Sequence, residues 1–237
     1  MRQIPDGMPR GEQKDPDPGH GGVLIVVSVE AEREAVLRGL GGGRDGAEVR
    51  IGGVGQAAAA ARTARLLAEA GDRFRLVVSA GIGGGFPGRA AVGSLVVATE
   101  IVAGDFGAES PERFLSVDEL GFGSARVPVE EELAGRVAEA LQGAGLPAQA
   151  GPIVTVSTAT GTAGTAEALA ARVPGAAAEA MEGYGVAAAA REFGLPVLEL
   201  RAISNAVGPR DREAWRIRDA LDALAAASAI LVSEVQR

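Results

Sequence analysis

Apolar residues in this chain gather in short runs, and most of the runs are followed by a segment patterned as a helix. The runs VLIVVSV at 23–29, FRLVVSA at 74–80 and SLVVATEIVA at 94–103 are nearly unbroken and rich in β-branched residues. Runs of this kind are typical of strands buried on both faces, as in a parallel sheet covered by helices. Shorter apolar runs predict further strands at 49–53, 151–156 and 196–204.

Between these strands, helical spacing or helix-boundary residues mark six segments. They are 31–40, 56–70, 130–143, 163–172, 182–193 and 216–235. The polar, irregular segment 106–126 is predicted to be a long surface loop. Strands that alternate with helices predict a single three-layer α/β/α domain with a mostly parallel, twisted central sheet.

The first 22 residues differ from the rest of the chain because they are rich in Pro, Gly and Asp. They lack the apolar core of a secretory signal, so residues 1–22 are predicted to be a disordered tail and residues 23–237 the catalytic domain. No apolar run reaches the roughly 20 residues that cross a bilayer. We therefore expect a cytoplasmic protein that does not bind membranes.

Composition narrows the chemistry that this domain can perform. The chain has no cysteine and one histidine, His20, which lies in the predicted tail. Disulfides, thiolate nucleophiles and Cys-based zinc sites are excluded, and we expect neither a metal nor an organic cofactor. The net charge is −8 and no Lys/Arg run is present, which argues against nucleic-acid binding. Catalysis must then rest on carboxylates, amides, hydroxyls and the backbone.

Candidate residues follow the strands, because ligands of α/β sheets bind at the carboxyl ends of strands. Two interpretations apply to Glu30 and Glu32, which follow the first strand. They supply a general base that activates water, or they are acidic residues that stabilise the first turn of a helix. After the strand at 74–80, GIGGG allows close approach of a ligand to the backbone, or forms a flexible turn. It is not a phosphate-binding P-loop, because no GK[ST] follows.

Two later segments carry similar alternatives. Glu182, after Met181, has a carboxylate that matches a vicinal diol, or that interacts with the helix dipole. Asn205 ends the strand at 196–204 with a side chain that both donates and accepts, or caps a turn before Pro209.

From about Gly22 to the C-terminus, the chain resembles the nucleoside phosphorylase/nucleosidase superfamily. Four segments in this order carry the resemblance: VEAE, VVSAGIGGG, EAMEG and RAISNAVG. They are most similar to the branch that holds methylthioadenosine/S-adenosylhomocysteine nucleosidase and futalosine hydrolase, and NAVGPRDREAW is similar to the latter. The resemblance implies hydrolysis of the N-glycosidic bond of futalosine, with release of hypoxanthine, in menaquinone biosynthesis. It also implies a homo-oligomer built on dimers.

The resemblance implies a role for each matched residue. Glu32 would activate the attacking water, and Glu182 would hold the ribose hydroxyls against which Met181 packs. The base and ribose pocket would be lined by Ser79, Ala80 and Gly81, and the purine contacted by Ala159 and Thr160. Asn205 stands where adenine-cleaving relatives have Asp, and an amide suits a 6-oxopurine such as hypoxanthine.

Arg210 and Arg212 carry two interpretations: they meet the carboxylate of futalosine, or they form a surface ion-pair cluster beside Trp215. The alternatives for the whole protein are an adenine-releasing nucleosidase, a purine nucleoside phosphorylase and a catalytically silent nucleoside-binding protein. Water is favoured over phosphate as nucleophile because Glu30 and Glu32 would repel a dianion. A dinucleotide-binding oxidoreductase is excluded, because VEAE replaces the glycine-rich turn after the first strand.

Overall fold

The computed structural model describes residues 21–41 and 46–237, so the predicted tail, His20 included, lies outside them except for Gly21 and Gly22. The described strands are β1 (Gly22–Val27), β2 (Ala47–Ile51), β3 (Phe74–Gly85), β4 (Leu95–Ala103), β5 (Gly107–Glu109), β6 (Phe114–Ser116), β7 (Arg126–Pro128), β8 (Ala148–Thr155), β9 (Ala178–Ala180) and β10 (Val197–Ala206). The described α-helices are α1 (Glu30–Gly39), α2 (Gln56–Ala70), α3 (Glu131–Gly143), α4 (Ala163–Arg172), α5 (Gly183–Glu192) and α6 (Ile217–Val235), and a 3₁₀ turn spans Gly71–Arg73.

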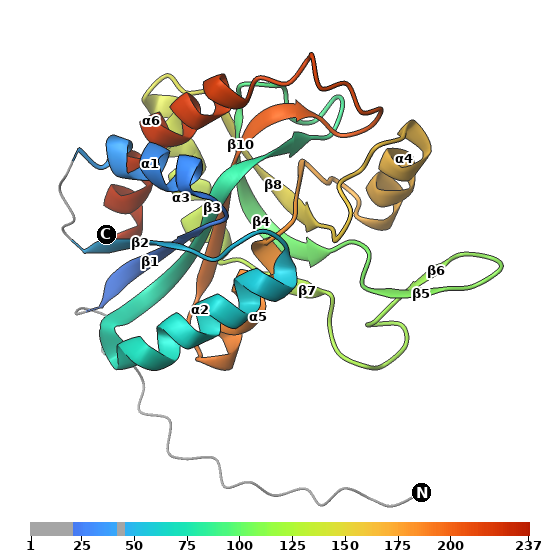
Figure 1. The fold of residues 1–237 in the computed structure, drawn as a ribbon, viewed down its shortest axis with the longest axis horizontal. Coiled ribbons are helices and arrows are strands. Elements are labelled where there is room, and N and C mark those ends of the chain that lie inside the picture. The colour runs from blue at the N-terminus through green and yellow to red at the C-terminus, as the bar shows by residue number, and fades with distance from the viewer. Residues whose placement is uncertain (1–20, 42–45) are drawn as a thin grey trace, which may run out of the picture.

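Eight of these strands form one sheet in the order β10-β4-β8-β9-β3-β1-β2, with β7 beside β4 (Figure 1). Because β10 also pairs with β3, the strands from β10 through β4, β8 and β9 to β3 close into a ring. Within this sheet five of the described pairings are parallel and three, β10–β4, β3–β9 and β4–β7, are antiparallel. The predicted α/β class is confirmed, but the sheet is mixed and closed, and it does not form a plain three-layer sandwich.

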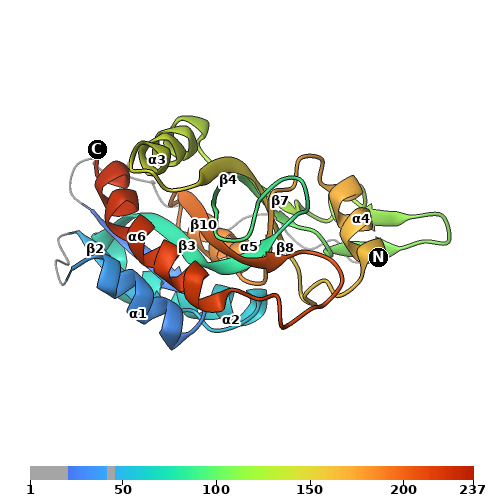
Figure 2. The same ribbon diagram turned by 90° about the horizontal axis from the view of Figure 1, so that it is seen from above.

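The helices pack around this sheet in two groups. Helix α6 packs against α1 and α3, and α2 packs against α5 (Figures 1 and 2). Strands β1, β3 and β10 run through the interior, where Leu24, Val77 and Leu198 are fully buried. Burial of an aliphatic side chain of this size contributes roughly 1.5–3 kcal/mol, so these strands form the rigid part of the molecule that positions their ends.

The glycine run GIGGG is the second half of a strand, so its interpretation as a flexible turn is wrong. Strand β3 continues to Gly85, and Gly81–Gly85 pair with β10. A Cβ atom on Gly83 would lie 2.7 Å from the carbonyl oxygen of Glu179 in β9. The glycines therefore let β9 and β10 approach β3 on both sides.

The segment 106–126, predicted to be a loop, contains ordered strands. β5 and β6 pair with each other as an antiparallel hairpin, and Arg126 begins β7. Figure 1 shows the hairpin reaching away from the main sheet beside α4. We call residues 106–124 the arm. It exposes Phe106 (47%) and Phe122 (83%).

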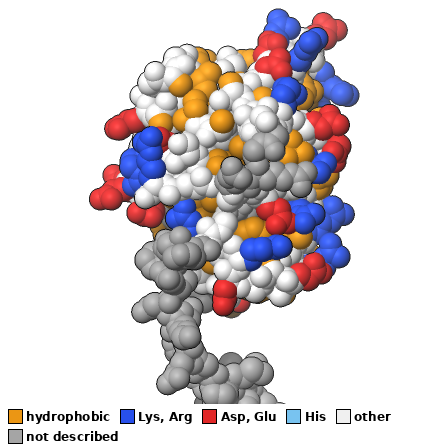
Figure 3. Space-filling model, turned by 90° about the vertical axis from the view of Figure 1, so that its left-hand side faces the viewer, with side chains coloured by type: hydrophobic (Ala, Val, Ile, Leu, Met, Phe, Trp, Pro, Cys, Tyr) orange, Lys and Arg blue, Asp and Glu red, His pale blue; other side chains and the backbone are white. Residues whose placement is uncertain are grey.

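Charges of both signs are interspersed on the surface. On the face shown in Figure 3, acidic and basic side chains lie next to one another around the edge. Arg38 pairs with Asp222, and Arg50 and Arg73 both pair with Glu48. Within residues 21–41 and 46–237, no helix is both long and apolar enough to cross a membrane.

Candidate functional site

Glu32 lies in the first turn of α1, and its side chain is turned into the protein. The residue is only 3% exposed. Its Oε2 accepts hydrogen bonds from the backbone N–H groups of Ser28 (2.8 Å) and Val29 (3.3 Å), while its Oε1 accepts one from Ile82 (2.9 Å). The carboxylate therefore both caps its helix and reaches the glycine strand. Glu30 instead pairs with Arg33 on the surface and lies outside the site, so it contributes nothing to repelling phosphate there.

Gly81 allows Glu32 to meet a second charged group. A Cβ atom on Gly81 would lie 2.5 Å from Oε1 of Glu32 and 2.7 Å from Nη1 of Arg201. Both side chains thus occupy the space beside the Gly81 backbone. The neighbouring predicted residues are buried, with Ser79 and Ala80 each 1% exposed.

Arg201 is the central residue of this cluster, and the sequence did not predict it as a site residue. It is 1% exposed, and its Nε donates to Oε1 of Glu199 at 2.8 Å. Its Nη2 donates to Oγ of Ser79 at 2.9 Å, and its Nη1 lies 3.4 Å from Oε2 of Glu182. Burial acts to lower the pKa of Arg201, but the carboxylates of Glu199, Glu182 and Glu32 outweigh it and raise the pKa. The guanidinium is thus held charged among three carboxylates.

Glu199, the partner of Arg201, is completely buried. Burial raises the pKa of its carboxyl group, against the opposing effect of Arg201. Its Oε2 has no hydrogen-bond partner among the described residues, and a Cβ atom on Gly183 would overlap it. The signal in the sequence was the pair of charged residues at alternate positions of VLELRAIS, which places both on one face of the strand.

Glu182 lies directly before α5, close to the predicted start of a helix at residue 182. Its side chain makes no capping bond to α5. Instead Oε1 accepts a hydrogen bond from the N–H of Gly55 at 3.1 Å, and Oε2 faces Arg201. Glu182 thus makes contacts that an interaction with the helix dipole alone does not require. Met181, immediately before it, is half-buried.

A second polar cluster lies at the end of β10. Oδ1 of Asn205 accepts a hydrogen bond from Oγ of Ser204 at 2.8 Å, and Nδ2 donates to the carbonyl of Ala206 at 3.0 Å. Asn205 lines a cavity of about 60 Å³ together with Thr160, Arg210 and Trp215. The backbone N–H of Arg210 donates to Gly161 at 3.2 Å, which joins the two loops around this cavity.

Thr160 is hydrogen-bonded to Glu179, a buried acid that was also not among the predicted site residues. Its backbone N–H donates to Oε1 of Glu179 at 2.9 Å, and its hydroxyl donates to Oε2 of the same carboxylate. Burial raises the pKa of Glu179, and Asp105 adds to that effect, while the two bonds from Thr160 oppose it. Ala159 and Thr160 also line a cavity of about 520 Å³ that extends to Asp105 and Arg172.

Arg210 and Arg212 do not form the ion-pair cluster that was one of their two interpretations. The guanidinium of Arg210 lies 5.1 Å, and that of Arg212 6.0 Å, from the ring centroid of Trp215. Neither makes an ion pair with a carboxylate among the described residues. Both side chains are exposed and available to a ligand.

The glycine strand links the two clusters. Glu32, Ser79 and Glu182 surround Arg201 beside Gly81, whereas Glu179 and Asn205 are both in register with Gly84. The two glycines are three residues apart, which is about 10 Å along a strand. The predicted residues thus form two polar clusters along a single strand.

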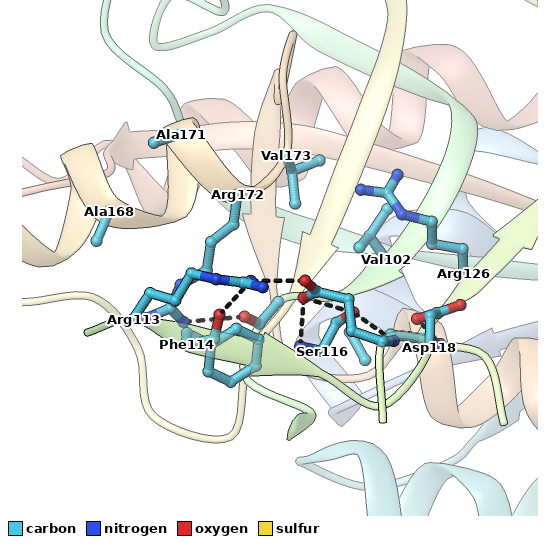
Figure 4. A pocket seen from close by; sticks show the side chains of 14 residues that line it. Val102, Arg113, Phe114, Ser116, Asp118, Arg126, Ala168, Ala171, Arg172 and Val173 are labelled. Carbon is cyan, nitrogen blue, oxygen red and sulfur yellow. Dashed lines mark hydrogen bonds and ion pairs between the residues drawn. The ribbon is translucent and has the colours of Figure 1, made fainter. Parts of the chain in front are cut away.

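A larger cavity lies away from these clusters. It has a volume of about 650 Å³ and is enclosed by the arm and α4 (Figure 4). The guanidinium of Arg172 lies 4.1 Å from the ring centroid of Phe114 there, and Arg113 pairs with Glu119. None of the site residues predicted from the sequence lines it. Cavity volume alone would therefore have indicated a functional site away from the predicted residues.

Among the residues that the structure describes, no group of three or more His, Asp or Glu side chains is placed to hold a metal ion. The buried carboxylates instead interact with Arg201, with backbone N–H groups and with Thr160. This arrangement has the components of acid–base and hydrogen-bonding chemistry.

Comparisons with known sequences bear on this arrangement. A family model described as the phosphorylase superfamily matches residues 10–237. The futalosine hydrolase of Streptomyces coelicolor is 50% identical over 219 residues, which cover 85% of this chain and 91% of that protein. The futalosine hydrolase of Acidothermus cellulolyticus is 44% identical over 224 residues, which cover 88% and 89%.

Solved structures share the fold. The 5'-methylthioadenosine/S-adenosylhomocysteine nucleosidase of Helicobacter pylori, with butyl-thio-DADMe-Immucillin-A, matches with a TM-score of 0.77 and 19% identity, covering 91% of this chain and 98% of that one. The futalosine hydrolase of Helicobacter pylori matches with a TM-score of 0.72 and 19% identity, covering 90% and 96%. At this identity the likeness shows the fold alone.

Proposed function

Since this chain belongs to the phosphorylase superfamily, we propose that its two clusters form one active site that hydrolyses futalosine and releases hypoxanthine. The observation that carries this function is the likeness to two futalosine hydrolases over most of the chain. The protein is an N-glycosyl hydrolase, and its product serves the menaquinone route to which futalosine belongs. The roles of the individual residues rest on the geometry of the site.

Glu32 is the residue that we assign to the attacking water. Its Oε1 lies at the Gly81 backbone beside Arg201. As the water oxygen bonds to C1′ of the ribose and the bond from C1′ to N9 breaks, a water proton passes to the carboxylate of Glu32. Proton transfer to a positioned side chain contributes typically 10²–10⁴-fold in rate.

Glu182 and Met181 are the residues that we assign to the ribose. Oε1 of Glu182 accepts one backbone N–H bond, which leaves acceptor capacity for sugar hydroxyls. Arg201 holds the carboxylate from the other side. Met181 is half-buried beside it and offers an apolar surface to the sugar ring.

Asn205 is the residue that we assign to the departing purine. The electron pair of the broken bond passes to the purine, and an amide donor at N7 stabilises the resulting negative charge. An amide cannot supply a proton, so the purine takes its proton from solvent. We place Ser79, Ala80 and Gly81 along the pocket and Ala159 and Thr160 beside the base. We assign Arg210 and Arg212 to the carboxylate of the substrate, because both side chains are exposed.

The charges of the first cluster favour water over phosphate as the nucleophile. Three carboxylates, Glu32, Glu182 and Glu199, surround the single cation Arg201. A phosphate dianion entering this cluster would meet like charges in a buried environment, where repulsion is strong. Hydrolysis is therefore favoured over phosphorolysis.

The test is to incubate the purified protein with futalosine, inosine and methylthioadenosine, each with and without phosphate, and to identify the released base and sugar. We expect hypoxanthine and a free sugar hydroxyl from futalosine, independent of phosphate. Glu32→Gln keeps the shape of the side chain and should lower kcat by about 10²–10⁴-fold. Release of adenine would instead indicate an adenine-releasing nucleosidase, and a sugar 1-phosphate would indicate a phosphorylase. Binding without any product would indicate a silent binding protein.

We also propose that the protein is cytoplasmic and forms a homo-oligomer built on dimers. The arm supports the second proposal, because the aromatic side chains of Phe106 and Phe122 are exposed there. Exposed apolar groups of this size are found at surfaces that bind another protein chain.

A further inference from the structure

The hydroxyl of Thr160 donates its only hydrogen bond to a carboxylate. It donates to Oε2 of Glu179, while the backbone N–H of the same residue donates to Oε1. Glu179 is 7% exposed, so water does not compete freely for these oxygens. Thr160 nevertheless lines a cavity together with Asn205.

This hydrogen bond determines which donors and acceptors Glu179 and Thr160 retain for a ligand. A threonine hydroxyl has one proton and two lone pairs, and an ionised carboxylate has lone pairs only. Once the hydroxyl proton is used within the pair, neither group has a proton left to donate. Glu179 and Thr160 together therefore present acceptors only.

The strand register brings this acceptor pair towards Asn205. Glu179 in β9 and Asn205 in β10 both lie opposite Gly84 in β3. Side chains at opposed positions of neighbouring strands point to the same face of the sheet. Over Gly84 itself lie Cγ2 of Val207 and Nδ2 of Asn205, 2.9 and 3.3 Å from the position of an added Cβ atom. Thr160 and Asn205 instead meet at the cavity that both residues line.

We propose that Glu179 and Thr160 determine the specificity of the site for a 6-oxopurine, a proposal that rests on the proposed function. A 6-oxopurine carries a hydrogen on N1, which donates a hydrogen bond to the acceptor pair. Asn205 hydrogen-bonds to the base on the side of N7 and O6. A 6-aminopurine instead has a lone pair on N1. This lone pair would face the lone pairs of the acceptor pair, and no hydrogen bond would form. A site built to bond one such group rejects an analogue that leaves its polar groups unpaired.

The experiment measures kcat/KM for futalosine and for its 6-amino analogue, and takes the ratio of the two values. Thr160→Val removes the hydroxyl at nearly constant volume. Glu179→Gln gives the pair an amide donor, which releases the hydroxyl proton of Thr160 towards N1. We expect each variant to lower the ratio at least ~10-fold relative to the wild type.

Two controls separate specificity from general damage. Thr160→Ser keeps the hydroxyl and should retain the wild-type ratio. Glu167→Gln makes the same chemical change as Glu179→Gln at an exposed position of α4 and should also leave the ratio unchanged. If a variant turns over too slowly to assay, the ratio of its affinities for hypoxanthine and adenine, measured by calorimetry, replaces the kinetic ratio.

The outcomes distinguish this inference from the function on which it rests. A wild-type ratio that persists within about twofold in both Thr160→Val and Glu179→Gln overturns the inference and leaves the hydrolase intact. A wild type that releases no hypoxanthine from futalosine overturns both. A fall of the ratio in both variants, with recovery in Thr160→Ser, supports the inference.

Discussion

At the level of single residues, the missing side chain at position 81 matters as much as the groups around it. Oε1 of Glu32 and Nη1 of Arg201 lie where a Cβ atom would stand. Any larger residue would separate the base that we assign to water from the cation that faces the ribose site. The glycine therefore has a steric role in the site that is distinct from flexibility.

Gly81→Ala should consequently lower activity by about 10²-fold, because it displaces the carboxylate and the guanidinium together. Overpacking of this kind also costs about 1–3 kcal/mol of stability. Steady-state kinetics and thermal unfolding measure the two effects. Gly135→Ala in α3 is the matched control, since nothing lies within 4 Å of its added Cβ, and it should be neutral or stabilising. Equal activity in the two variants would contradict this assignment.

Glu199 gives a prediction about pH. Its folded-state pKa is raised by burial, so the folded protein binds a proton more tightly there than the unfolded chain does. The stability that this residue contributes is present below its unfolded pKa of about 4.3 and is lost as the pH rises through the folded pKa.

Glu199→Gln does not titrate, so the stability advantage of the wild type over this variant should shrink between about pH 4.3 and neutral pH. Thermal unfolding of both proteins across that range measures the difference. Glu167→Gln on the surface provides the baseline. A difference in Tm that stays constant, or that grows with pH, would refute the assignment.

Of the site residues, the sequence predicted those that follow strands, such as Glu32, Glu182 and Asn205. It did not predict Arg201 or Glu199, because charged residues within an apolar strand gain their partners only through the tertiary fold. Glu179 was missed for the same reason, since its partner Thr160 is 19 residues away in the sequence.

At the level of elements, the long apolar runs predicted β1, β3, β4 and β10 well, because full burial requires such runs. β9 was missed, since three residues, Ala178–Ala180, are too few to show a period of two. The hairpin of the arm was missed because its strands pair with each other and bury little. The direction of pairing also escaped prediction, since periodicity is the same for a parallel and an antiparallel neighbour.

At the level of the whole molecule, the arm is the feature that the main sheet does not explain. It reaches out beside α4 and encloses the cavity of Figure 4 with that helix. In the segment between β6 and β7, the side chain of Phe122 is 83% exposed, so little of it is buried within a single chain. A second copy of the chain is the partner that we propose for it.

Phe122→Asp should therefore shift the protein from dimer towards monomer, because a charge in an apolar contact must be desolvated without a partner. Light scattering after size-exclusion chromatography measures the mass directly. Val92→Asp, at another exposed apolar position (43% exposed), is the matched control. A wild type that is monomeric at all concentrations would disprove the dimer proposal.

The ring formed by β10, β4, β8, β9 and β3 also affects how the site can open. The two strands that carry Gly81, Arg201 and Asn205 are neighbours in the ring, and neither ends the sheet. Fraying begins at unpaired edges, so the backbone amides of these strands should exchange with deuterium only when the whole domain unfolds. Substrate must then enter and leave through movements of the loops above the strands, while the catalytic floor stays folded throughout the cycle.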